Sequence, residues 1–252
     1  MKLGVLLSPL AQPDDAHALR DQAREYESLG YSGIWSAQAT GRGFMMTDPL
    51  LALATAAAVT ETIRLGTAVL QLPLYNPLAL AHSVFSLQQL CGDRLILGVG
   101  AGSTAADFQV FGQDYDDRFG RFNRSASTLK HILASGSQGD ANLTPWQAVI
   151  GGPPLYLGSW GNQVITAAER FDGWIASAHY RSVEDIALAA ERYHRAGGKH
   201  AIVSTIQLSQ QTDLSELKDR LQRFEEIGFE EAVVMFLPGG PDPARIIKLL
   251  DA

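Results

Sequence analysis

The sequence predicts a single (β/α)₈, or TIM, barrel, the α/β fold in which eight parallel strands alternate with helices. Three observations carry this prediction. The chain has 252 residues, the usual size of one such barrel. Short apolar runs recur eight times, and each is followed by a turn and a segment of helical periodicity. Strict alternation requires parallel strands joined by right-handed crossovers, and so many units in one chain favour closure over an open sheet.

The eight expected strands are apolar along their whole length, as strands must be when helices cover both faces of a parallel sheet. They are Leu3–Ser8, Gly33–Ala37, Ile63–Leu70, Arg94–Gly100, Leu155–Gly158, Gly173–Ser177, Ala201–Leu208 and Ala232–Leu237.

Short polar and glycine signals mark the helix boundaries. The helix expected over Asp14–Leu29 stops at Gly30. Three dipeptides predict an N-cap followed by proline at the first helical position, and they are Asp48-Pro49, Asn76-Pro77 and Asp242-Pro243. Asp213 and Glu216 resemble a capping box, and the helix that follows them ends at Gly228.

One stretch interrupts this rhythm. Residues 136–154 are rich in glycine, proline and polar side chains and lie between the fourth helix and the fifth strand. We expect a surface excursion of one barrel domain that spans residues 1–252. A cover over the working site and a plain linking loop are about equally compatible with its composition.

Charge and composition exclude several function classes. Lys and Arg number 20 against 27 Asp and Glu, so the net charge of −7 gives no reason to expect nucleic acid or an anionic membrane as a partner. Cys91 is the single cysteine, so no internal disulfide is expected. No apolar run is long enough to span a bilayer or to form a signal sequence, and we expect a cytoplasmic protein.

Two glycine-rich turns are candidates for ligand binding. Residues 98–103 lack the third glycine of a dinucleotide fingerprint, so a close approach of ligand to bare backbone or a plain rim turn is the better interpretation. Residues 158–162 precede a helix over Gln163–Arg170. Backbone N–H groups at such a helix start attract anions, so this turn is a candidate phosphate site or an ordinary cap.

Several motifs in the right order resemble the bacterial-luciferase-like flavin-dependent oxidoreductases, the luciferase-like monooxygenase family. The motifs are Arg64-Leu65-Gly66-Thr67-Ala68-Val69, Arg94 to Gly102, Asp107 to Gly112 with Arg118, Pro154 to Ser159, and Phe171-Asp172-Gly173-Trp174. The resemblance implies a barrel that binds FMN, or the deazaflavin F420, over the carboxyl ends of its strands. It also implies an oxidoreductase acting on a small organic substrate.

The resemblance assigns cofactor roles to positions of this chain. It implies a non-proline cis peptide at Ala68–Val69 that presses against the flavin ring, with Thr67 beside it. Gly102 and Ser103 fall on the side of the ribityl phosphate. The turn from Gly158 to Asn162 corresponds to the phosphate loop, so the implied cofactor-binding residues there are Gly158, Ser159, Trp160 and Gly161.

Two departures from the family pattern bear on the chemistry. Directly after the expected second strand stand Gln38 and Ala39, where many members have an acidic residue and a histidine. Ala101 replaces an arginine of luciferase itself. Gln38 cannot exchange a proton near neutral pH, but it can hold a substrate or flavin edge. His179 follows the sixth strand, so Gln38 and His179 are the candidate catalytic residues, with a structural role for His179 as the alternative. No cluster has metal-ligand spacing.

The leading hypothesis is a monooxygenase that uses reduced FMN, O₂ and a small organic substrate, with a separate flavin reductase and a homodimeric assembly as expected partners. Three alternatives stay open. They are hydride transfer with F420, a flavin-binding partner subunit with little activity, and an unrelated phosphate-binding barrel such as an aldolase or isomerase. The last lacks a well-placed lysine or paired carboxylates at the strand ends.

Overall fold

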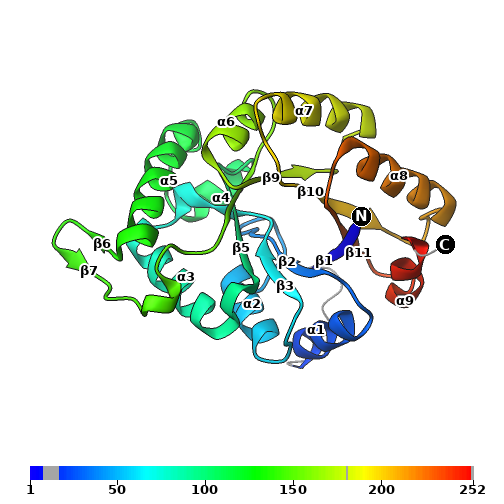
Figure 1. Ribbon diagram of the computed structural model, residues 1–252, viewed down its shortest axis with the longest axis horizontal. Helices are drawn as coiled ribbons and strands as arrows, with labels where there is room; N and C mark the ends of the chain where they lie inside the picture. The colour runs from blue at the N-terminus through cyan, green and yellow to red at the C-terminus, as the bar shows by residue number, and fades with distance from the viewer. Residues whose placement is uncertain (8–16, 180, 251–252) are drawn as a thin grey trace.

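The computed structural model describes residues 1–7, 17–179 and 181–250, and these form a closed barrel of parallel strands surrounded by helices (Figure 1). Neighbouring strands follow the order β3-β2-β1-β11-β10-β9-β8-β5-β4, and a further pairing of β3 with β5 closes the ring. The barrel segments are β1 (Lys2–Leu6), β2 (Gly33–Ser36), β3 (Arg64–Thr67), β4 (Leu70–Gln71), β5 (Leu95–Gly100), β8 (Leu155–Gly158), β9 (Gly173–Ser177), β10 (Ala201–Leu208) and β11 (Glu231–Phe236).

The helices lie outside the barrel, as Figure 1 shows. They are α1 (Ala18–Ser28), α2 (Pro49–Ala57), α3 (Pro77–Cys91), α4 (Ala105–Val110), α5 (Arg118–Ser135), α6 (Gln163–Arg170), α7 (Val183–Arg195), α8 (Leu214–Ile227) and α9 (Pro243–Ile247), with 3₁₀ turns η2 (Leu72–Leu74), η3 (Gly92–Arg94), η4 (Gln147–Val149) and η5 (Lys248–Leu250). Within the described ranges, no helix has the length and apolar character needed to cross a membrane.

The predicted barrel is confirmed, and the strand boundaries differ from prediction in one informative place. The third strand, expected as one run over Ile63–Leu70, is divided into β3 and β4. Residues 68 and 69 interrupt the ladder between them: β3 pairs with β2 and β5, whereas β4 pairs with β5 further along. The end of the first expected strand at Ser8 and the start of the first expected helix at Asp14 lie outside the described residues.

The predicted helix starts are confirmed by their hydrogen bonds. Each cap side chain accepts from backbone N–H groups of the first turn: Asp48 from Leu50 and Leu51, Asn76 from Leu78 and Ala79, Asp213 from Ser215 and Glu216, and Asp242 from Ala244. These oxygens satisfy donors that a helix leaves unpaired at its start. The cap half of the expected box at Asp213 is therefore present.

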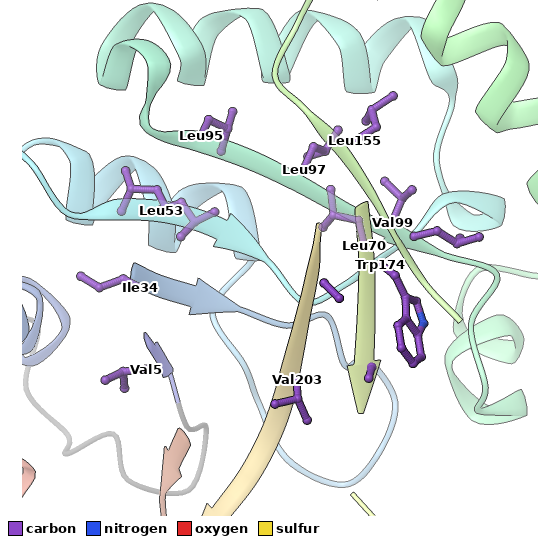
Figure 2. Packing of buried hydrophobic residues seen from close by; sticks show 14 of the residues in the cluster. Val5, Ile34, Leu53, Leu70, Leu95, Leu97, Val99, Leu155, Trp174 and Val203 are labelled. Carbon is purple, nitrogen blue, oxygen red and sulfur yellow. The ribbon is translucent and has the colours of Figure 1, made fainter. Parts of the chain in front are cut away.

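The core has two layers because alternate strand residues face opposite sides of the barrel wall. Outward side chains pack against the helices, and Figure 2 shows part of this layer, where Leu97 on β5 lies beside Leu155 on β8. Inward side chains form a separate cluster inside the barrel, which comprises Leu6, Trp35, Ile96, Tyr156, Ile175, Ile202, Val233 and Met235. Burial on both faces explains why the strands are apolar throughout.

Trp35 fills the barrel interior beside β1, β2 and β3, on the side away from the strand carboxyl ends. Its indole lies against Gly4, Gly33 and Gly66, where any Cβ would meet the ring or the neighbouring Glu231 carboxylate. The indole Nε1 donates to Glu231 Oε1 at 3.3 Å. Glu231 is fully buried, and it also accepts from Ser32 Oγ at 2.7 Å and from Arg64 Nη2 at 2.8 Å. A buried carboxylate needs these partners because its desolvation is costly.

The excursion at residues 136–154 contains an antiparallel hairpin of β6 (Ser137–Gln138) and β7 (Ala141–Asn142), followed by η4. The hairpin extends away from the barrel in Figure 1. It connects the end of a helix to the start of a strand, and in a (β/α)₈ barrel such connections lie at the end opposite the strand carboxyl termini. This placement favours the linking loop over the cover.

A double-mutant cycle tests the filling of the interior by Trp35. Gly66→Ala should lower the free energy of unfolding by about 1–3 kcal/mol, since the added methyl group meets the indole ring. In a Trp35→Phe background the same change should cost less, because the smaller ring leaves room. Urea denaturation of the four proteins measures the cycle, and an equal cost in both backgrounds would contradict the packing described here.

Candidate functional site

The carboxyl ends of β3, β5 and β8 meet around the side chain of Val69. A Cβ placed on Gly158 would lie 2.6 Å from Val69 Cγ1, and one on Gly100 would lie 2.9 Å from Val69 Cγ2. Both positions therefore require glycine for space. The predicted cofactor-side residues at 69 and 158 are thus brought into contact by the fold.

The interruption of the third strand has the predicted backbone feature. The peptide bond between Ala68 and Val69 is cis, and neither residue is proline. The Ala68 N–H donates to Ser36 O at 2.8 Å, and the hydroxyl of the fully buried Thr67 donates to Gly98 O at 2.7 Å. Thr67 therefore uses its hydroxyl to join two strands, and its predicted contact with a cofactor stays a prediction.

An apolar floor closes the barrel below its mouth. Ala37, Ala68, Val69 and Leu237 are partly buried, and they pack onto the interior cluster that contains Trp35. They follow or interrupt strands at their carboxyl ends, so they separate the filled interior from the open face. A flat, largely apolar ring is the kind of group that such a surface accommodates.

A buried carboxylate, Asp107 on α4, ties the loops of this face together. Its oxygens accept from Arg42 Nε at 2.9 Å, from the Thr40 N–H at 3.1 Å and from Gln71 Nε2 at 2.6 Å, and Arg42 Nη2 also donates to it. Asp107 is fully buried, whereas the Arg42 side chain is 30% exposed. Burial by itself raises the pKa of Asp107, but the donors from Arg42, Gln71 and Thr40 lower the pKa overall, so the group stays ionised.

This carboxylate sets the orientation of the Gln71 side chain, while the Gln71 backbone holds Gln38. Gln71 must direct Nε2 toward Asp107, which leaves its buried Oε1 without a hydrogen-bond donor among the described residues. That oxygen lies where a Cβ on Gly102 would fall, and Gly102 has a φ of +85°. Gln38 Oε1 accepts from the Gln71 backbone N–H at 2.8 Å. The candidate catalytic amide is therefore oriented through its oxygen, and its NH₂ group and the second lone pair of that oxygen can still be offered to a ligand.

The predicted phosphate turn lies between β8 and α6. Ser159 Oγ is buried and has no hydrogen-bond partner among the described residues, and Gly161 has a φ of +61° with open space at its Cβ position. Trp174 Nε1 fixes the turn by donating to Ser159 O at 3.2 Å. The Arg181 guanidinium carbon lies 3.9 Å from the centroid of the Trp160 ring. A cation thus stands beside a turn that already carries an unsatisfied hydroxyl.

Two further predicted site residues, Ser103 and His179, lie in the segments that follow β5 and β9. Ser103 is exposed, and its carbonyl accepts from the Tyr115 hydroxyl at 3.0 Å. His179 follows β9 and is partly buried, and its backbone N–H donates to Ser177 Oγ at 3.3 Å. Burial and then the charge of Arg181 lower the pKa of His179 below its ordinary value, so the imidazole is neutral at pH 7.

The network of Arg42, Gln71 and Asp107 was missed by sequence reasoning. Asp107 appeared there only as part of a motif, and Arg42 lies in a glycine-flanked loop with no periodicity to mark it. Only Asp107 and Phe108 are buried on the six-residue α4, so the local sequence carries no clear signal of a buried charge and does not name the partner. Among the described residues, no group of three or more His, Cys, Asp or Glu is arranged to hold a metal ion.

The fold and this mouth define a (β/α)₈ barrel with apolar residues and hydrogen-bonding groups together at the strand carboxyl ends. The chain belongs to the luciferase-like monooxygenase family, whose model matches residues 1–225. It is 34% identical over 143 residues to 4-hydroxyprotoasukamycin monooxygenase of Streptomyces nodosus subsp. asukaensis, a match that covers 56% of this chain and 38% of that protein. The chain thus corresponds to well under two thirds of that relative's length.

Solved structures share the fold at low sequence identity. An F420-dependent secondary alcohol dehydrogenase in complex with an F420–acetone adduct has a TM-score of 0.75 and 16% identity over 99% of this chain and 97% of that chain. The oxygenating constituent of 3,6-diketocamphane monooxygenase from Pseudomonas putida, in complex with FMN, has a TM-score of 0.67 and 18% identity, over 88% and 71% of the two chains.

The Asp107 network gives a direct mutational prediction. Asp107→Asn should lower the free energy of unfolding by about 1.5–3 kcal/mol, the usual cost of losing a buried hydrogen bond to a charged group. It should also speed proteolysis within residues 39–47, which Asp107 anchors through Thr40 and Arg42. Asp117→Asn is the matched control, because Asp117 pairs with Arg124 on the surface and such pairs contribute under about 1 kcal/mol. Equal effects of the two variants would contradict the anchoring role.

The same carboxylate predicts a pH dependence. The pKa of Asp107 is lowered in the folded protein, so its ionisation stabilises the fold at any pH above the unfolded value of about 3.9. The stability difference between the wild type and Asp107→Asn should be constant above about pH 5 and should shrink as the pH falls below about 3.9. Urea denaturation between pH 3 and pH 7 measures this, and a difference independent of pH would disprove it.

Proposed function

We propose that this protein is a flavin-dependent oxidoreductase, a monooxygenase that uses reduced FMN and O₂ on a small organic substrate. The observation that carries the proposal is the juxtaposition of an apolar floor at Ala68 and Val69 with the turn at Ser159 through Gly158. A flat ring and a phosphate are the two ends of FMN, joined by its ribityl chain, and these two surfaces suit them separately. The membership of the luciferase-like monooxygenase family supports the same assignment.

The residues of the turn fit a phosphate group. Ser159 Oγ lacks a protein partner, so a phosphate oxygen would satisfy a hydroxyl that the fold leaves orphaned. The turn leads into α6, whose first N–H groups and dipole favour an anion. Arg181 adds a positive charge beside Trp160. Gly158, Ser159, Trp160 and Gly161 would therefore hold the phosphate, and Thr67, Ala68, Val69, Gly102 and Ser103 would lie along the ring and the ribityl chain.

The bound cofactor would supply the redox chemistry and the activation of O₂, and the protein would supply binding, orientation and exclusion of water. Gln38 would orient a ligand rather than transfer protons, because its amide does not ionise near neutral pH, and its Oε1 is held by the Gln71 N–H. His179 is the candidate proton acceptor, since its lowered pKa keeps the ring neutral at pH 7. A separate flavin reductase and a homodimeric assembly stay predictions.

Titration with FMN, riboflavin and F420, followed by absorbance and fluorescence, tests the cofactor. FMN should bind at micromolar concentration and riboflavin more weakly, because riboflavin lacks the phosphate. Binding of F420 alone would replace the monooxygenase by a hydride-transfer enzyme, and binding of none would refute the proposal. Stopped-flow reoxidation of the bound reduced cofactor with and without O₂ then separates the two chemistries.

Ser159→Asp tests the placement of the phosphate. The added carboxylate should weaken FMN binding at least about tenfold through like-charge repulsion, while the affinity for riboflavin changes little. Ser215→Asp is the matched control, since Ser215 is exposed in the first turn of α8 after a different strand. Undiminished FMN affinity in Ser159→Asp would show that the phosphate is held elsewhere.

A further inference from the structure

A second concave site lies outside the barrel mouth. A cavity of about 430 Å³ opens between residues 73–77, which follow β4 and enter α3, and the first half of α5. Its volume falls within the range of about 300–1,000 Å³ found for small-molecule sites. None of its lining residues belongs to the strand-end turns described above. The proposed flavin chemistry therefore leaves this cavity unexplained.

The cavity is lined by hydrogen-bond donors and carries positive charge. Arg121 and Arg124 on α5 both line it, and none of the lining residues within the described chain is acidic. Arg121 Nη2 donates to Pro73 O at 3.3 Å, whereas its buried Nε meets no acceptor among the described residues. The Arg121 guanidinium thus has one backbone acceptor and an unsatisfied Nε, and an anion in the cavity could offer the charge-assisted hydrogen bonds that an arginine favours.

The other polar lining residues, Tyr75, Asn76, Gln113 and Ser125, can all donate hydrogen bonds. Asn76 Oδ1 is used by the Leu78 and Ala79 N–H groups at the start of α3, so this side chain can present only its NH₂ group to a ligand. Burial, with a smaller contribution from Asp48, raises the pKa of Tyr75, so its hydroxyl stays protonated. Ser125 adds a further hydroxyl. An anion would meet donors on several sides.

The acidic group paired with Arg124 does not prevent an anion from binding. Asp117 Oδ2 accepts from Arg124 Nη2 at 2.9 Å, but both side chains are exposed, at 47% and 67%. Such surface pairs are weak and readily exchange partners. The remaining wall is apolar and is provided by Pro73, Leu74 and Pro77. The cavity thus combines a charged end with an apolar surface.

We propose that the cavity between residues 73–77 and α5 binds a small organic anion, with its carboxylate or phosphate group on Arg121 and Arg124 and its apolar body against Pro73, Leu74 and Pro77. The segment that forms one wall continues directly from Gln71, whose side chain contacts Asp107 at the barrel mouth. An anion in the cavity would therefore lie one short turn of chain away from the candidate active site.

Calorimetric titration at one fixed ionic strength tests the site with benzoate, phenyl phosphate and the neutral benzyl alcohol. At least one of the two anions should bind saturably below about 10 mM, and benzyl alcohol should not. Arg121→Gln should raise the dissociation constant of the anion at least about tenfold. Arg195→Gln is the matched control, because Arg195 lies on α7 and pairs only with the exposed Glu191 among the contacts described. Its anion affinity should equal that of the wild type.

A second variant guards against a folding defect, since Arg121 also contacts Pro73. Ser125→Asp places a negative charge in the cavity without removing that contact, and it should likewise weaken anion binding at least about tenfold. Absence of saturable binding by the wild type, equal binding of benzyl alcohol, or unchanged affinity in both cavity variants would overturn the proposal. Flavin titration of the same variants separates the two sites, because cofactor affinity should be unaffected whether or not the cavity binds an anion.

Discussion

The mouth of the barrel is organised around one buried negative charge. Asp107 is fully removed from water, so its carboxylate must be paired, and Arg42, Thr40 and Gln71 provide the donors. These partners come from two segments: Thr40 and Arg42 from the segment after β2, and Gln71 from β4 at the end of the third strand. The desolvation cost of the carboxylate thus holds three strand-end segments in one arrangement. Within it, the Gln71 backbone N–H bonds the Gln38 side chain, and the Gln71 side chain leaves no room for a Cβ at Gly102.

The two ends of the barrel interior differ in how tightly they are packed and in whether their polar groups are paired. At the lower end Trp35 fills the space over Gly4, Gly33 and Gly66, and its polar N–H is paired with the buried Glu231. That end is closed and fully packed. At the upper end, small and branched side chains form a floor, and polar groups such as Ser159 Oγ lack partners. The interior around Trp35 is packed, whereas the strand carboxyl ends carry unsatisfied polar atoms. This difference is typical of a barrel that places its chemistry at the carboxyl face of its strands.

Positive charge on this acidic chain is concentrated locally. The net charge is −7, yet Arg181 stands beside the turn at Ser159, and Arg121 and Arg124 line the outer cavity. Local donors decide whether a small anion is held, because charges on the far surface are screened within about 10 Å at moderate salt. The overall charge therefore predicts nothing about small phosphate or carboxylate ligands, although it bears on nucleic acid and membrane partners.

The sequence by itself determined the alternation of strands and helices, the capped starts at Asp48 and Asn76 and the glycine turns, because these signals depend on residues within one or two helical turns. It also indicated the cis peptide at Ala68–Val69 through its family resemblance. Only the tertiary structure decided that Ile63–Leu70 is interrupted, that Val69 contacts Gly158, and that Arg42 pairs with Asp107, 65 residues away. Such pairings arise where barrel closure brings distant turns together, and no local pattern records which side chains then meet.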